Sequence, residues 1–285
     1  MTPRAAPAVV ELGLHALAFA PAPEPGSLHD PRYAAWCRAN LPADAWRPLD
    51  EDAALLAALA ARAGPAWWAL QLLPFAHRDV AGLVAAAAHP VAALDPRDAA
   101  RPDAAEAIRA LARDHEALVE VARADAALVA RAYERSHASL ITPLTLRAVE
   151  DAAPSLTLAA ALAPALTRCD VALSFVLGAR GRAYGDVLVL GAPCPWSDLP
   201  AERPAVLALH ELAVTAAMAA TMGDALARWA AAEGVALRAV ESLTRGTALE
   251  GAWGSWRGEV DARGAEAVGA GDARVGRVLA ALREG

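Results

Sequence analysis

Apolar residues recur along most of the chain at the spacing of an amphipathic α-helix. The clearest stripe runs through residues 102–140, where apolar positions three and four apart oppose arginines and glutamates. A further helix is predicted at 144–166, and Pro154 and Pro164 are expected to break it, because proline lacks a backbone N–H. The same signals predict helices at 31–39, from Asp50 as N-cap onward, and at 205–229, 234–243 and 272–283.

One region has the pattern of strands. Residues 170–177 and 184–190 are rich in β-branched and other apolar residues, and the glycines at 178 and 181 lie between them. We therefore expect a β-hairpin of these two runs, packed beside the apolar helix at 205–229. The predicted fold is α+β, predominantly helical, with a small hairpin or sheet at about 170–190 next to a buried helix.

No repeat period and no shift in composition marks a domain boundary. A single domain is expected over residues 1–285, with an N-terminal helical half at 1–168 and a second half at 169–285. The residues are 56% hydrophobic and 5% aromatic, and alanine and leucine dominate the apolar share, which favours helix over sheet. The longest apolar stretches contain charged residues or proline, so no membrane span is expected.

Charge and cysteine content exclude further classes of protein. The formal net charge is −7 and the chain has no lysine, so its field would repel nucleic acid. The thiols Cys37, Cys169 and Cys194 are odd in number and lack CxxC spacing, which is typical of free thiols in the cytoplasm rather than of a disulfide framework. None has a histidine near it in the sequence, so no catalytic thiolate is expected.

His210 and Glu211 are the pair of residues in the sequence that most resembles part of an active site. His210 and Glu211 lie in the apolar helix 205–229, directly after the predicted hairpin. This arrangement resembles the zincin metallopeptidases, and specifically the gluzincin branch, in which an edge hairpin precedes an HExxH helix and a glutamate ligand follows on the next helix. The resemblance spans residues 170–243.

The resemblance implies a role for each matching position. His210 would bind a zinc ion, Glu211 would be the general base that activates a water molecule, and Glu233 or Glu241 would be a further ligand. The implied cofactor is zinc, and the implied activity is hydrolysis of peptide or amide bonds. The chain departs from the motif at Val214, which stands where the second histidine belongs and cannot coordinate a metal.

Three interpretations of this departure remain open. Either the metal is lost and a zincin-like fold serves binding, or a distant histidine completes a rearranged site, or there is no kinship with zincins. For a rearranged site, His137 is the better donor, with Tyr133 one turn before it. His115, on the same predicted helix, would lie about 33 Å from His137 at 1.5 Å per residue, so one site cannot use both.

A purely structural role for His210 and Glu211 is a further open interpretation. A buried glutamate needs a partner, and Arg238 or Arg245 could form an ion pair with Glu211. Two functions from different classes follow. The first is a zinc-dependent hydrolase with an incomplete motif, and the alternative is a non-catalytic binding or scaffold module for an unidentified peptide or protein segment. The pair Glu11 and His15, spaced i and i+4, is treated as accidental.

Overall fold

The computed structural model describes residues 3–6, 32–51, 142–178, 180–184, 186–192, 199–220, 225–260 and 272–284, together with Glu11, His15, Ala18, Phe19 and Ala54. The chain divides into two compact units. Unit 1 comprises Met1–Ala5, Leu146–Ser174 and Ala179–Gly285, and unit 2 comprises Ala6–Thr145 and Phe175–Gly178. The expectation of a single domain over the whole chain stays a prediction.

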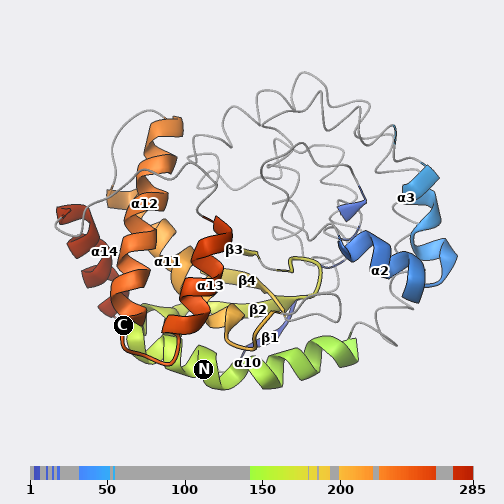
Figure 1. Cartoon of the computed structure of the whole chain (residues 1–285), viewed down its shortest axis with the longest axis horizontal. Coiled ribbons are helices and arrows are strands. Elements are labelled where there is room, and N and C mark those ends of the chain that lie inside the picture. Colours follow the sequence, from blue (N-terminus) through green and yellow to red (C-terminus); the bar gives the residue numbers. More distant parts are fainter. Residues whose placement is uncertain are drawn as a thin grey trace. The chain divides into compact units, whose positions relative to one another are not determined.

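Unit 1 is built around a small mixed sheet with strand order β1-β2-β4-β3 (Figure 1). Strands β1 (Arg4–Ala5), β2 (Asp170–Ser174) and β4 (Val187–Gly191) run parallel, whereas β3 (Gly181–Tyr184) runs antiparallel to β4. The last four residues of β2 and of β4 are buried. Continuous burial of this kind is typical of strands that lie in the parallel part of a sheet.

The predicted hairpin is wrong in its pairing. Strand β2 lies parallel to β4, with Val171 opposite Leu188, and the hairpin is instead formed by β3 and β4. The pairing of Tyr184 with Val187 leaves a two-residue connection, which is the commonest length for a hairpin loop. Apolar runs and glycines indicated that strands exist here, but they could not tell which strands are neighbours.

Within the described residues of unit 1, six helical segments accompany the sheet, and α11 lies at their centre. It packs on β3 and β4 and against α12, α13 and α14 (Figure 1). Ala205 to Leu209 near its start are all buried, as expected of a helix that is apolar on every face. The segments are α10 (Thr142–Leu162), the 3₁₀ helix η4 (Pro164–Arg168), α11 (Arg203–Ala220), α12 (Ala225–Thr244), α13 (Glu250–Val260) and α14 (Ala273–Arg283).

The α+β, predominantly helical fold is confirmed, with differences at individual helix boundaries. Pro154 does not break α10, because it lies on the exposed face, where water can bind the carbonyl that it leaves without a donor. The single helix predicted at 205–229 is two helices, since α11 ends at Ala220 and α12 begins at Ala225. The closing helix is confirmed, with Asp272 accepting a hydrogen bond from Arg274 N as N-cap.

The described part of unit 2 holds three short helical segments and the buried positions Glu11 and His15. The segments are α2 (Arg32–Asn40), the 3₁₀ helix η1 (Ala43–Ala45) and α3 (Arg47–Glu51). The short helix expected at 31–39 is thus confirmed as α2. Asp50 is not an N-cap: it lies inside α3, where its carboxylate accepts a hydrogen bond of 2.7 Å from Arg38 Nε. The helix predicted at 102–140 lies outside the described residues.

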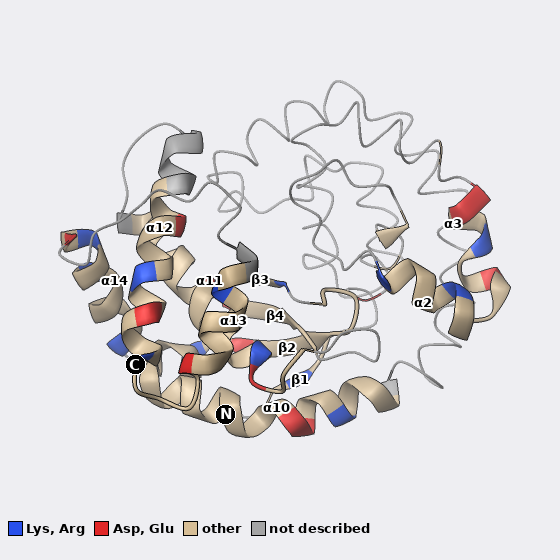
Figure 2. Ribbon diagram, in the orientation of Figure 1, with Lys and Arg blue, Asp and Glu red and all other residues tan. Residues whose placement is uncertain are grey.

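The surface of the described helices carries both signs of charge. Arginines and acidic residues are interspersed along α10 and α12 (Figure 2). Among the helices of the described residues, none combines the length and the apolar character needed to span a bilayer.

Candidate functional site

The candidate site lies between the first half of α11 and the middle of α12. These two helices pack against each other, and the side chain of His210 on α11 meets that of Glu233 on α12. His210 Nε2 donates a hydrogen bond of 3.0 Å to Glu233 Oε1. Both residues are buried, with 6% and 8% of their surface exposed. Two residues that are 23 positions apart in the sequence therefore form a buried ion pair between helices.

Glu211 completes a cluster of three ionisable side chains. Its Oε1 atom lies 3.5 Å from His210 Nδ1, and the residue is 7% exposed. At this distance the two groups attract each other electrostatically, but within the described residues Nδ1 has no hydrogen-bond partner. The cluster of His210, Glu211 and Glu233, hereafter the His210 cluster, is thus one imidazole between two carboxyl groups.

Helix α13 covers the His210 cluster with an indole ring. The Trp256 ring centroid lies 4.6 Å from that of His210, and Trp253 lies 5.2 Å from Trp256. Both tryptophans are 4% exposed and are spaced i and i+3 on the inner face of α13. From the sequence, Trp253 and Trp256 could line a ligand pocket, but aromatic residues at this spacing are more often part of a core, so neither was predicted as a site residue. The helix itself was not predicted, because three glycines make the segment a poor helix former.

The electrostatic environment holds His210 in its charged form. Burial by itself would lower the pKa of His210, but the charge of Glu233 and the contacts with both carboxyl groups outweigh it and raise the pKa to about 10. The imidazole is therefore protonated at neutral pH. An imidazolium has no lone pair to offer a metal ion, so metal binding at His210 would have to displace its proton.

Val214 occupies the position of the missing second histidine. It lies one helical turn after His210 on α11, and it is 1% exposed, so an apolar side chain fills this place in the core. A catalytic zinc site has three protein ligands, whereas the match offers His210 and Glu233 alone. In keeping with this, no group of three or more His, Cys, Asp or Glu residues among those described is arranged to hold a metal ion. The donor set present does not fit the zinc ion that the resemblance implies.

The 3.0 Å distance between His210 Nε2 and Glu233 Oε1 suits two different situations. It is the length of a hydrogen bond, and it is also close to the separation of about 3.3 Å between two ligand atoms at the corners of a zinc tetrahedron with bonds of about 2.0 Å. The number of ligands, rather than this distance, is therefore what separates an ion pair from a metal site.

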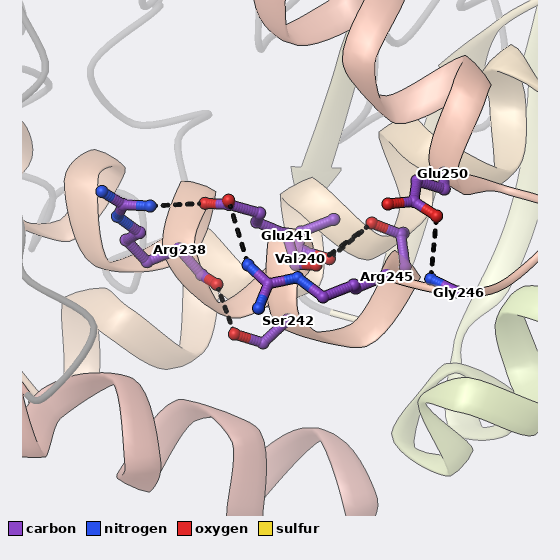
Figure 3. Close-up of polar contacts among 8 residues, drawn as sticks. Arg238, Val240, Glu241, Ser242, Arg245, Gly246 and Glu250 are labelled. Atoms are coloured by element: carbon purple, nitrogen blue, oxygen red, sulfur yellow. Dashed lines mark hydrogen bonds and ion pairs between the residues drawn. The ribbon is translucent and has the colours of Figure 1, made fainter.

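Glu241, the other predicted ligand, lies away from the His210 cluster. Its carboxylate accepts hydrogen bonds of 2.7 Å from Arg238 of α12 and 3.4 Å from Arg245, which directly follows that helix, at the surface (Figure 3). It lies eight positions after Glu233, which corresponds to about 12 Å along a helix. The predicted pairing of Glu211 with Arg238 or Arg245 is also not found, since the ionic partner of Glu211 is His210. His137 and Tyr133 lie outside the described residues.

A second buried polar cluster in unit 2 was missed at the sequence level. His15 Nε2 donates a hydrogen bond of 2.9 Å to Ala45 O, and Tyr33 donates its hydroxyl proton to His15 Nδ1 at 2.9 Å. Burial, opposed by the bond to Ala45, lowers the pKa of His15 to about 4, so the ring is neutral. Glu11 accepts a hydrogen bond of 3.1 Å from Phe175 N. Both members of the i, i+4 pair are buried, and each is hydrogen-bonded to different partners.

The thiol of Cys37 lies beside a histidine in the folded chain. Its Sγ atom lies 4.0 Å from His15 Nδ1, although 22 positions separate them in the sequence. This neighbour could not be inferred from spacing in the sequence, because only the fold brings the two residues together. Even so, burial raises the pKa of Cys37 to about 12, so the thiol is not activated and the cluster is structural.

Comparisons with protein-family models, curated proteins and solved structures found no match. The geometry of the described residues is thus the basis for any functional conclusion.

Proposed function

We propose that this chain is a non-catalytic, zincin-like binding module in which the ion pair of His210 and Glu233 takes the place that the metal ion has in the zincin metallopeptidases. The observation that carries this proposal is the buried, apolar Val214 at the place where a further ligand would have to be, which leaves His210 and Glu233 in direct contact at 3.0 Å.

The topology around the cluster supports the zincin-like part. An antiparallel strand, β3, forms the end of the described sheet, the connection from β4 leads into α11 with His210 and Glu211, and α12 supplies Glu233. This is the order of elements that the resemblance to the gluzincins implies. A zinc ion in such a site joins the two helices through its ligands, and here a charged hydrogen bond joins them directly.

The proposed partner is an extended peptide or protein segment. Strand β3 pairs with β4 on one side, and none of the other described strands pairs with its second edge. A sheet edge of this kind can accept an added strand through its backbone N–H and C=O groups. A cytoplasmic location is part of the proposal, and the free thiols of Cys37 and Cys169 support it.

Metal analysis of the purified protein tests the proposal first. The proposal predicts that the protein holds no stoichiometric zinc and that His210→Ala leaves its metal content unchanged. Stoichiometric zinc that is lost in His210→Ala would overturn it in favour of the second candidate, a zinc-dependent hydrolase with Glu211 as base. That candidate is favoured by one observation, the retention of a buried carboxylate beside His210.

Restoring the missing ligand gives a sharper test. Val214→His places a second imidazole one turn from His210, so that two histidines and Glu233 could share one zinc ion. We expect the variant to bind zinc stoichiometrically and the control Val214→Ala, which removes the same side chain without adding a donor, to bind none. If neither variant binds zinc although both are folded, the zincin-like part of the proposal is wrong.

Peptide binding without cleavage is the remaining expectation. Affinity selection from a random peptide library, followed by mass spectrometry of the mixture, should retain extended peptides that stay intact. Cleavage that disappears in Glu211→Gln would instead establish a hydrolase.

A further inference from the structure

Gly181 stands at a position of β3 where the backbone does not require glycine. It pairs with Leu190 of β4 in regular antiparallel register. The described glycines with positive φ are Gly178 and Gly246, so Gly181 has a backbone conformation that any residue could adopt. Glycine weakens a strand, since it adds no side-chain packing and loses more conformational freedom on folding. Its presence here therefore calls for a steric reason.

The steric reason is the close approach of α11. A Cβ atom built on Gly181 would lie 3.2 Å from Glu211 Cγ, 3.1 Å from Leu190 Cδ2 and 3.5 Å from Leu207 Cβ. The first two distances are shorter than ordinary van der Waals contact. Other described glycines have free space around them: nothing lies within 4 Å of a Cβ atom built on Gly251, Gly254, Gly258 or Gly276.

The three neighbours differ in how far they can yield. Leu190 Cδ2 is the end of a flexible side chain and can change rotamer, whereas Leu207 Cβ is fixed by the backbone of α11. Glu211 Cγ lies near the base of its side chain, so moving it displaces the carboxyl group beyond it. That carboxyl group is the one whose Oε1 lies 3.5 Å from His210 Nδ1.

We infer that Gly181 is a positioning residue of the His210 cluster: its lack of a side chain lets Glu211 lie against β3 and holds the Glu211 carboxylate beside His210. The inference deepens the proposed function and rests on the same site, since it assigns β3 a role in the geometry of that site. The role of Gly181 does not depend on whether the site binds a metal ion. The inference can therefore fail while the proposed function stands, and the proposed function can fail while the inference stands.

A double-mutant cycle measures the contact. Gly181→Ala should raise the equilibrium constant of unfolding by about 5- to 30-fold, the usual effect of one extra methyl group in a packed site. In a Glu211→Ala background, where the crowded Cγ is absent, Gly181→Ala should raise the equilibrium constant of unfolding at most about threefold. A difference of this size between the two backgrounds is typical of residues in contact. The matched control Gly254→Ala should not raise this constant in either background, because its methyl group would meet open space.

The cycle also covers a variant that does not fold. If Gly181→Ala is unfolded but the double variant with Glu211→Ala folds, the contact is supported. If Gly181→Ala is equally harmful in both backgrounds, or is relieved only by Leu190→Ala, the methyl group does not act on Glu211 and the inference is overturned.

A spectroscopic measurement separates positioning from mere packing. The ¹⁵N signal of His210 Nδ1 at neutral pH reports the carboxylate beside it, and we expect Gly181→Ala to move this signal in the same direction as Glu211→Ala does. Gly254→Ala should leave it unchanged. An unchanged signal in a folded Gly181→Ala variant would show that Glu211 keeps its place without the glycine, contrary to the inference.

Discussion

Replacing Glu233 with glutamine tests whether the buried ion pair stabilises the packing of α11 on α12. The variant keeps the shape of the side chain and an acceptor oxygen but removes the charge that faces His210 Nε2 at 3.0 Å. Removing one partner of a buried ion pair costs about 3–5 kcal/mol. Because glutamine can still accept a hydrogen bond and Glu211 remains nearby, we expect a loss of about 3 kcal/mol in the free energy of unfolding.

The raised pKa of His210 points to a stabilisation of the same order. A rise from 6.5 to about 10 corresponds to roughly 5 kcal/mol for the His210 cluster as a whole, of which the charge of Glu233 is the largest favourable part. A histidine whose pKa is higher in the folded than in the unfolded state stabilises the folded protein. This contribution is fully present at a pH below the pKa of the unfolded state, and it is lost as the pH rises through the pKa of the folded state. The difference between wild type and Glu233→Gln should therefore be largest below pH 6.5 and shrink towards pH 10.

Urea unfolding followed by circular dichroism and by tryptophan fluorescence measures both effects, provided that the two transitions coincide. Glu241→Gln is the matched control on the same helix. Its carboxylate pairs with arginines on the exposed face, so its loss should cost less than about 1 kcal/mol at every pH. If Glu233→Gln costs no more than Glu241→Gln, or if its cost does not depend on pH, the buried pair does not stabilise the helix packing and the reasoning above is refuted.

Three other predictions concern separate parts of the chain. The pKa of His15, lowered to about 4, means that its contribution to stability is present above pH 6.5 and is lost as the pH falls through 4; His15→Gln should flatten the acid limb of a stability–pH curve. Thiol labelling with mass spectrometry should modify the half-buried Cys169 before Cys37, which is buried and whose pKa is raised to about 12, and equal rates in the folded state would contradict this order. Gly254→Ala should stabilise the protein by about 0.4–1 kcal/mol, whereas Gly246→Ala should destabilise it by about 1–2 kcal/mol because φ there is +72°; calorimetry of both variants would expose an error in either sign.

Local signals in the sequence were informative where the chemistry is local. Asp272 as N-cap and the closing helix α14 follow from neighbouring residues, and so does the short helix α2. The prediction of strands near 170–190 was correct, but their pairing was wrong, because partners in a sheet are chosen by contacts outside the strand itself. Pro154 shows the same limit, since it was expected to break the helix but lies on the exposed face of a continuous α10.

The site shows this division most clearly. The sequence by itself singled out His210 and Glu211, because they match the first half of an HExxH motif in an apolar helix. The resemblance to the gluzincins then left Glu233 and Glu241 as the candidates for a further ligand. Only the tertiary structure decided between these two: the packing of α11 on α12 buries Glu233 against His210 and leaves Glu241 among arginines at the surface. Likewise, only the fold brings Trp256 over the imidazole and Gly181 against Glu211. Residue type determines which groups must have a partner when they are buried. Which partner each group has depends on which helix faces meet, and the packing of the whole unit determines those faces.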